Sequence, residues 1–188
     1  MSGPRSGDGP DGSPSRARRA LAGFGTLVFL FLAPGFVAGL VPFWISRWRL
    51  QPPWLGFAAI RVAGALLILA GLAVLLESFW RFAVKGLGTP APVVPTRRLV
   101  VTGLYRYVRN PMYLAVAAII AGQALLFGEA RLLGYGAFVW CMFHLFVLVY
   151  EEPTLAAAYP AEYEDFRANV PRWIPRLRPW RPGSVQKS

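Results

Sequence analysis

Two polar segments beside apolar stretches carry the residues best suited to chemistry. Residues 103–113 read GLYRYVRNPMY and lead into an uncharged run, and the next long uncharged run ends at Glu151 and Glu152. Arginines near a helix start suit a carboxylate or phosphate, whereas paired glutamates suit an ammonium group, ribose hydroxyls or nearby arginines. Polar clusters at the mouth of an apolar bundle are costly unless something binds there. The arrangement favours a polar cofactor at a membrane surface and a lipophilic substrate in the bilayer.

Asn110 and Pro111 predict a helix start. An asparagine side chain can accept hydrogen bonds from the free amides of the first turn, and proline suits the first helical position because it lacks an N–H. We therefore expect Asn110 to cap this helix and the positive end of its dipole to lie at the surface. Glu151 and Glu152 are expected at the end of the following helix, where acids oppose the dipole and need a partner.

Long uncharged runs decide the fold class. The chain has 188 residues, of which 55% are hydrophobic, and a mean hydropathy of +0.44, which is too apolar for an ordinary soluble domain. A membrane-spanning helix needs roughly 20 apolar residues. Runs of about this length cover residues 20–45, 54–76 (with Arg61 inside), 111–128 and 132–150. The sequence predicts an all-α polytopic membrane protein with four transmembrane helices and a cytoplasmic C-terminal amphipathic helix.

The basic residues indicate the orientation of the chain. Of the 20 lysines and arginines, all but four lie in the N-terminal tail, the loop before residue 111 or the C-terminal segment. The four exceptions are Arg47, Arg49, Arg61 and Arg131. By the positive-inside rule, both termini are expected in the cytoplasm, so the net charge of +11 reflects topology and not a nucleic-acid partner. The excess of arginine over lysine, with abundant Ala, Gly and Pro, is typical of a GC-rich bacterium and predicts the bacterial inner membrane.

Composition divides the chain into four parts. Residues 1–19 predict a disordered basic cytoplasmic tail, and residues 20–80 the first two transmembrane helices. Residues 81–176 predict the core, with a cytoplasmic loop, a helical hairpin and the C-terminal helix over 153–168. Residues 177–188 predict a second disordered tail. The composition does not indicate an oligomeric state.

The pattern G-x-Y-R-Y-x-R-[HN]-P-x-Y, followed by a helical hairpin and E-E-x-x-L, resembles the isoprenylcysteine carboxyl methyltransferase-like family. This family is similar to other membrane methyltransferases, including phospholipid methyltransferases. The resemblance covers residues 77–176 and implies S-adenosylmethionine as methyl donor. It also implies a lipophilic acceptor (a carboxylate, thiol or amine) that enters from the bilayer. The implied cofactor-binding residues are Gly103, Tyr105, Arg106, Tyr107, Arg109, Asn110, Pro111, Tyr113, Glu151, Glu152 and Tyr163.

Three further residues are candidates for a catalytic role. Arg106 and Arg172 could hold an anionic acceptor. His144 lies seven positions before Glu151, so the two side chains share nearly one helix face, and it is either a base or a buried histidine bonded to a neighbouring helix. Many relatives have histidine where this chain has Asn110, and an asparagine cannot take up a proton at neutral pH. The resemblance therefore implies no general base at that position.

Simpler interpretations remain open for the same residues. Arginines and tyrosines beside a membrane helix are ordinary interfacial anchors, and the two glutamates could pair with arginines. Glu77 and Arg81 are spaced to pair on one helix, and Gln123 is expected to bond another helix. One histidine and one cysteine, Cys141, make metal binding improbable. The alternative function is a non-catalytic membrane subunit that binds a ligand or a partner with the same helical core.

Overall fold

The computed structural model describes residues 33–85, 99 and 101–181, and these residues form helices and connecting segments without a β-strand. The all-α class predicted from the sequence is confirmed for this part of the chain. The longer helices are α2 (Val41–Ser46), α3 (Ala59–Lys85), α4 (Pro111–Phe127), α5 (Ala130–Phe146), α6 (Glu152–Ala158) and α7 (Pro160–Asn169). The short helical turns are η1 (Phe36–Leu40), η2 (Trp54–Gly56), η3 (Gly103–Arg106) and η4 (Val147–Glu151). The expected tail over residues 1–19 lies outside the described residues.

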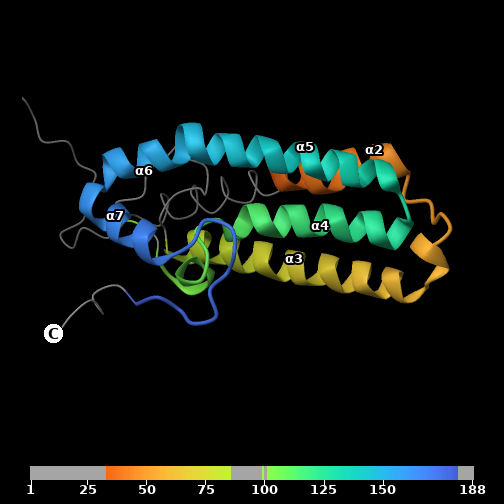
Figure 1. Ribbon diagram of the computed structural model, residues 1–188, viewed down its shortest axis with the longest axis horizontal. Helices are drawn as coiled ribbons and strands as arrows, with labels where there is room; N and C mark the ends of the chain where they lie inside the picture. Colours follow the sequence, from red (N-terminus) through yellow and green to blue (C-terminus); the bar gives the residue numbers. More distant parts are fainter. Residues whose placement is uncertain (1–32, 86–98, 100, 182–188) are drawn as a thin grey trace, which may run out of the picture.

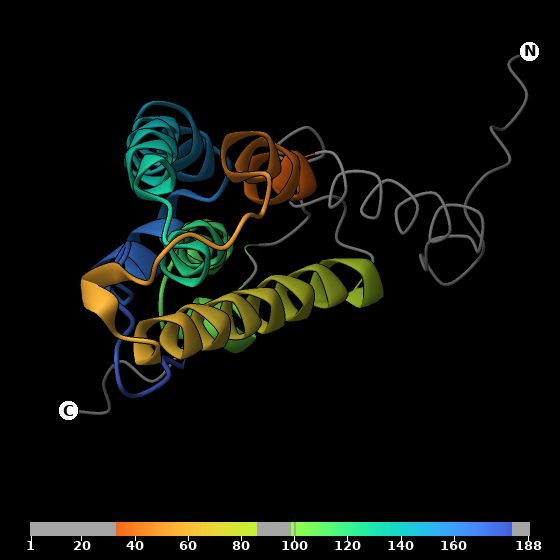
Figure 2. The same ribbon diagram turned by 90° about the vertical axis from the view of Figure 1, so that its right-hand side faces the viewer.

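Helix α4 lies at the centre of the bundle. It packs against α3 and α5, and the helix formed by η1 and α2 completes its surroundings (Figures 1 and 2). Gln123 of α4 is buried and donates to the carbonyl oxygen of Ala38 at 2.6 Å, and its Oε1 accepts a hydrogen bond from the Trp48 indole at 3.2 Å. The expected interhelical role of Gln123 is thus confirmed. These bonds satisfy the amide group of Gln123 inside apolar surroundings. They also join the first helix to the centre of the bundle.

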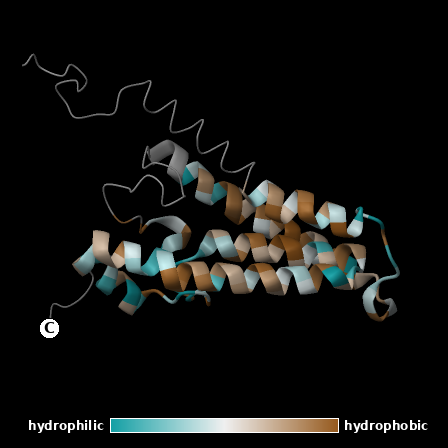
Figure 3. Ribbon diagram, turned by 90° about the horizontal axis from the view of Figure 1, so that it is seen from above, coloured by the Kyte–Doolittle hydropathy of each residue, from teal (hydrophilic) through white to brown (hydrophobic). Residues whose placement is uncertain are grey.

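Two helices are long and apolar enough to cross a membrane. They cover Ala59–Arg81 and Ala130–Ala158, and two shorter apolar helices cover Ala33–Ser46 and Pro111–Phe127. Hydrophobic residues follow the helices of the bundle and hydrophilic residues gather toward its ends (Figure 3). Two of the four expected spans therefore meet the length requirement, and a total of four spans stays a prediction. The first expected run begins before residue 33, outside the described residues.

The helix that carries the paired glutamates does not end at them. Segments α5, η4 and α6 form one continuous helix over Ala130–Ala158, with a π-helical turn at η4. The expectation that Glu151 and Glu152 oppose a helix dipole at a C-terminus is therefore wrong, because another turn and a half follows them. The expected amphipathic helix over 153–168 is divided at Tyr159, where φ is −138°, and α7 then buries Tyr163 and Phe166.

Glycines allow α3 and α4 to approach closely. A Cβ atom placed on Gly64 would lie 2.7 Å from the carbonyl oxygen of Gly122 and 2.7 Å from the amide nitrogen of Leu126. A Cβ atom on Gly122 would lie 2.7 Å from the carbonyl oxygen of Gly64. Backbone atoms on both sides leave no flexible group that could move aside. The close contact between α3 and α4 therefore depends on these glycines.

Gly64→Ala should lower the free energy of unfolding by about 1–3 kcal/mol, since the added methyl group must push two packed helices apart. Gly134→Ala is the matched control, because nothing lies within 4 Å of a Cβ atom at Gly134 in α5. Thermal unfolding in detergent compares the two variants. Equal melting temperatures for Gly64→Ala and Gly134→Ala would contradict the close approach.

Candidate functional site

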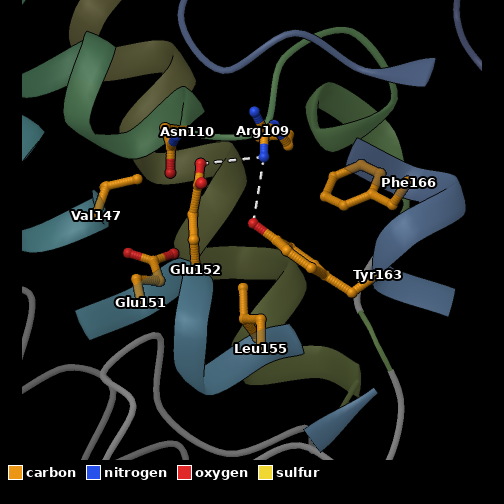
Figure 4. Close-up of a pocket in the computed structure, with 8 residues that line it drawn as sticks. All are labelled: Arg109, Asn110, Val147, Glu151, Glu152, Leu155, Tyr163 and Phe166. Carbon is orange, nitrogen blue, oxygen red and sulfur yellow. Dashed lines mark hydrogen bonds and ion pairs between the residues drawn. The ribbon is translucent and has the colours of Figure 1, made fainter. Parts of the chain in front are cut away.

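A pocket lies at the end of the bundle where α4 begins. It is lined by residues at the start of α4, by one face of the helix through η4 and α6, and by the buried face of α7 (Figure 4). The enclosed cavity is about 20 Å³, and it opens to the surface. The lining residues are Arg109, Asn110, Val147, Glu151, Glu152, Leu155, Tyr163 and Phe166. The two polar segments singled out in the sequence thus meet at one site.

Glu152 is the centre of an ion-pair network. Its carboxylate lies 3.0 Å from Arg109 Nη1, and it accepts two hydrogen bonds from Arg172, at 2.6 Å from Nε and 2.9 Å from Nη2. Arg109 Nη1 also donates to the hydroxyl oxygen of Tyr163 at 3.2 Å (Figure 4). The hydrogen bonds with Glu152 raise the pKa of Arg172, so this guanidinium stays charged. Burial, and next the carboxylate of Glu152, raise the pKa of Tyr163, so its hydroxyl stays neutral.

Glu151 has a different environment from its neighbour. It accepts a hydrogen bond from the Tyr113 hydroxyl at 2.8 Å, and it forms no ion pair with any described cation. The side chain is half-buried and lines the same pocket. A half-buried carboxylate without a cation is expensive, because one neutral hydrogen bond does not replace the lost hydration. Glu151 is therefore the group in the pocket best placed to bind a cation or hydroxyl groups of a ligand.

The GLYRYVRNP segment is held against the end of α3. Gly103 has a φ of +58°, and a Cβ atom there would collide with the guanidinium of Arg81. Arg81 in turn pairs with Glu77, as the spacing of these two residues predicted. Only glycine combines the left-handed conformation with this close approach, so Gly103 has a structural reason to be in the motif. Its expected contact with a cofactor stays a prediction.

A second segment covers the motif from outside. We call residues 170–181 the C-terminal strap. Backbone hydrogen bonds join its Pro171 oxygen to the Arg109 amide, its Arg176 amide to the Tyr107 oxygen and its Trp180 amide to the Arg106 oxygen, each at 2.9 Å. Arg106 Nε also donates to the Trp180 oxygen at 2.6 Å. The packed part of the chain therefore extends beyond the tail boundary expected at residue 177, since Trp180 is buried against Tyr163 and Phe166.

Asn110 has a role that the sequence did not indicate. It precedes α4, but its side chain makes no capping hydrogen bond. Instead, Asn110 Nδ2 donates to the backbone oxygen of Arg172 at 3.2 Å. The expectation that Asn110 caps the helix is thus wrong, because the strap lies close enough to take its amide group. Pro111 is the first residue of α4, as expected.

Asn110→Asp should lower the free energy of unfolding by about 1–2 kcal/mol, at least as much as Asn110→Ala does. An aspartate removes the N–H donor and places a carboxylate against the carbonyl oxygen of Arg172 in a buried position. A capping role would give the opposite order, since aspartate is a good N-cap residue. Thermal unfolding of both variants decides, and a stable Asn110→Asp protein would refute the strap contact.

His144 also contacts the strap. The Trp173 indole N–H donates to Nδ1 of His144 at 3.0 Å, so the histidine is bonded to the strap and not to a neighbouring helix. Trp173 further contacts the rings of Trp140 and Tyr113, with centroids 4.5 and 6.5 Å apart. Because Nδ1 accepts this hydrogen bond, it cannot serve as a base in this arrangement. His144 does not line the pocket, but the ring of Trp173 contacts both His144 and Tyr113.

The structure brings part of the predicted set together. Of the expected residues, the pocket is lined by Arg109, Asn110, Glu151, Glu152 and Tyr163. Tyr113 and Arg172 contact this group through Glu151 and Glu152. The remaining candidates lie outside the lining and are Gly103, Tyr105, Arg106, Tyr107, Pro111 and His144.

Three apolar residues of the lining were missed, namely Val147, Leu155 and Phe166. The spacing of four between Val147, Glu151 and Leu155 places them on one helix face, and this spacing could have found the first two. Phe166 lies three residues after Tyr163 on α7, so the same rule applies to it.

The family model described as phospholipid methyltransferase matches residues 59–162, which is more than half of the chain. The match runs from the start of α3 through the motif, α4 and both glutamates to the first turn of α7. No curated protein and no solved structure matches the chain.

Proposed function

Because the chain belongs to the phospholipid methyltransferase family, we propose that it is a membrane methyltransferase that uses S-adenosylmethionine to methylate a lipophilic acceptor. The observation that carries the proposal is the pocket at the end of the bundle. It combines a carboxylate that pairs with no described cation, a half-buried arginine and a tyrosine, and it lies at the end of the bundle where α4 begins. Such a site can take a polar ligand from one side and an apolar one from the bilayer.

The donor set fits the proposed cofactor. S-Adenosylmethionine would supply the methyl group, and it carries a carboxylate, an ammonium group, ribose hydroxyls and an adenine ring. Arg109 and the start of α4 suit the carboxylate, Glu151 suits the ammonium group or the ribose, and tyrosine rings suit adenine. Among the residues that line the pocket, the buried Nε of Arg109 has no hydrogen-bond partner within the described part of the chain. Unsatisfied buried atoms of this kind support a site that binds a polar ligand.

In this proposal, the protein accelerates the reaction mainly by positioning the reactants. Methyl transfer is a displacement at a carbon atom, and much of the rate gain comes from holding the reactants in line and excluding water. Arg172 already holds Glu152, and Arg106 already bonds the Trp180 oxygen. We therefore assign both arginines to positioning the pocket wall rather than to binding the acceptor directly. The acceptor class is a lipophilic carboxylate, thiol or amine.

The orientation proposed here places the pocket and both termini in the cytoplasm, which follows from the distribution of arginines. Activity reporters fused at Gln51 and Glu129 should report the outer side of the membrane, and a reporter fused after Ser188 the inner side. The loops at Gln51 and Glu129 meet at the end of the bundle opposite the pocket, where Gln51 Nε2 donates to Glu129 Oε2 at 3.1 Å. A C-terminal reporter on the outer side would contradict the orientation.

The proposed activity is tested by methyl transfer. Purified full-length protein in bilayers of bacterial lipid is incubated with S-adenosylmethionine labelled on its methyl group, and lipid-soluble products are extracted and counted. We expect label in the lipid fraction that depends on the protein and falls strongly in Glu151→Ala. Binding of the cofactor without transfer to any of a panel of lipophilic carboxylates, thiols and amines would favour a non-catalytic subunit instead.

A further inference from the structure

The C-terminal strap has two different faces. Trp173 and Trp180 point into the protein, where Trp173 bonds His144 and Trp180 is only 6% exposed. Between them, Ile174 is 80% exposed and Leu177 is 98% exposed. Two aliphatic side chains this exposed on one short segment need another surface to cover them.

The strap lies where one of the candidate membrane spans ends. The span Ala59–Arg81 ends beside Gly103, which contacts Arg81, and the strap bonds the residues that directly follow Gly103 (Figure 1). If the bundle crosses a membrane at this span, we expect Ile174 and Leu177 at the level where hydrocarbon gives way to headgroups. A lipid leaflet is present at this level in any membrane that the bundle crosses.

The charges of the strap suit an anionic surface. Residues 170–181 contain four arginines and no acid. Arg172 is bound to Glu152, and Arg176 donates to the Asn169 oxygen at 2.5 Å, so both serve inside the protein. Arg178 is exposed, directly follows Leu177 and forms no ion pair with a described residue. An exposed arginine beside exposed aliphatic side chains is the composition of segments that lie in the interface of anionic membranes.

We propose that the strap is an interfacial membrane anchor. Ile174 and Leu177 insert into the leaflet beside the bundle, and Arg178 binds the headgroups of anionic phospholipids. Because the inner side of the same segment bonds Arg106, Tyr107, Arg109 and Asn110, the anchor fixes the wall of the pocket to the membrane surface. The strap lies outside the region matched by the family, so this property is assigned from the structure of this chain alone.

The test measures what covers Leu177. Leu177→Cys in a Cys141→Ser background is labelled with an environment-sensitive fluorophore, and the full chain is placed in nanodiscs of phosphatidylcholine alone or mixed with phosphatidylglycerol. The matched control is a label at Glu164→Cys, on the exposed charged face of α7. We expect iodide to quench the label at 177 several-fold less than the label at 164. Lipids with a quencher near the headgroup should quench only the label at 177.

Three outcomes would overturn the proposal. Equal iodide quenching at both positions would show that Leu177 faces water. Protection from iodide without quenching by the lipid would show that protein covers the strap. Finally, we expect the label at 177 to be better protected from iodide in anionic nanodiscs than in phosphatidylcholine alone, and Arg178→Gln should remove this difference. Protection that is equal in both lipids and unchanged by Arg178→Gln would refute the role of anionic headgroups.

Discussion

Glu151→Gln is expected to weaken the binding of S-adenosylmethionine by about 1–3 kcal/mol, the cost of losing a charge-assisted hydrogen bond. Glutamine has nearly the same shape and can still accept the hydrogen bond from Tyr113, so only the negative charge is lost. The free energy of unfolding should stay within about 0.5 kcal/mol of wild type, since no described cation depends on this carboxylate.

Calorimetric titration of the cofactor into purified protein measures this effect. Glu164→Gln serves as the control, because Glu164 is an exposed carboxylate on α7 that forms a surface pair with Arg167. The control should bind the cofactor like wild type. Unchanged affinity in both Glu151→Gln and Glu151→Ala would remove Glu151 from the cofactor site.

Glu152→Ala should mainly destabilise the protein, by about 3 kcal/mol, because removing one partner of a buried pair leaves the other charge uncompensated. The Arg109 and Glu152 side chains are 10% and 13% exposed, so water screens their pair poorly. Without Glu152, the cations of Arg109 and Arg172 would face each other, and the strap would lose its ion pair with α6. Weaker cofactor binding would follow from a disordered pocket.

Thermal and denaturant unfolding measure this loss, with Glu164→Ala as the matched control. That variant removes an exposed ion pair and should cost less than about 1 kcal/mol. A double variant, Glu152→Ala with Arg172→Ala, should recover part of the stability, since it also removes one of the two uncompensated cations. If Glu152→Ala melts like Glu164→Ala, the network around Glu152 does not hold the strap.

Topology explains why the meeting of the two polar segments could be predicted. Hydrophobic runs indicate two antiparallel helices between residue 110 and residue 151, and antiparallel neighbours bring both ends of the hairpin to one surface. The contacts of Glu77 and Gln123 followed from helix spacing and from the cost of an unpaired amide in apolar surroundings. These predictions required only the spacing of residues on a regular helix and the length of helix that crosses a bilayer.

The different roles of Glu151 and Glu152 could not be predicted. Adjacent residues on a helix point about 100° apart, but the sequence does not indicate which of them faces Arg109 and which faces Tyr113. The helix also continues past both residues, because the end of an uncharged run marks a membrane boundary and not a break in backbone hydrogen bonds. Sequence periodicity therefore located the site but left the role of each acid open.

The strap was missed for a related reason. Its three prolines exclude a regular helix, and no local rule says where such a segment packs. The docking depends on long-range contacts, such as those of Asn110 with the Arg172 oxygen and of Trp173 with His144. Asn110 was expected to cap α4 because the capping rule considers only the helix itself.

Hydrogen–deuterium exchange of the full chain in nanodiscs, with and without S-adenosylmethionine, tests most directly whether the pocket is the cofactor site. We expect slower exchange on binding in residues 101–113, 147–166 and 170–181, which surround the pocket. Residues 47–58, at the opposite end of the bundle, should exchange at the same rate in both samples. Slower exchange elsewhere with no change around the pocket would show that the cofactor binds at another site.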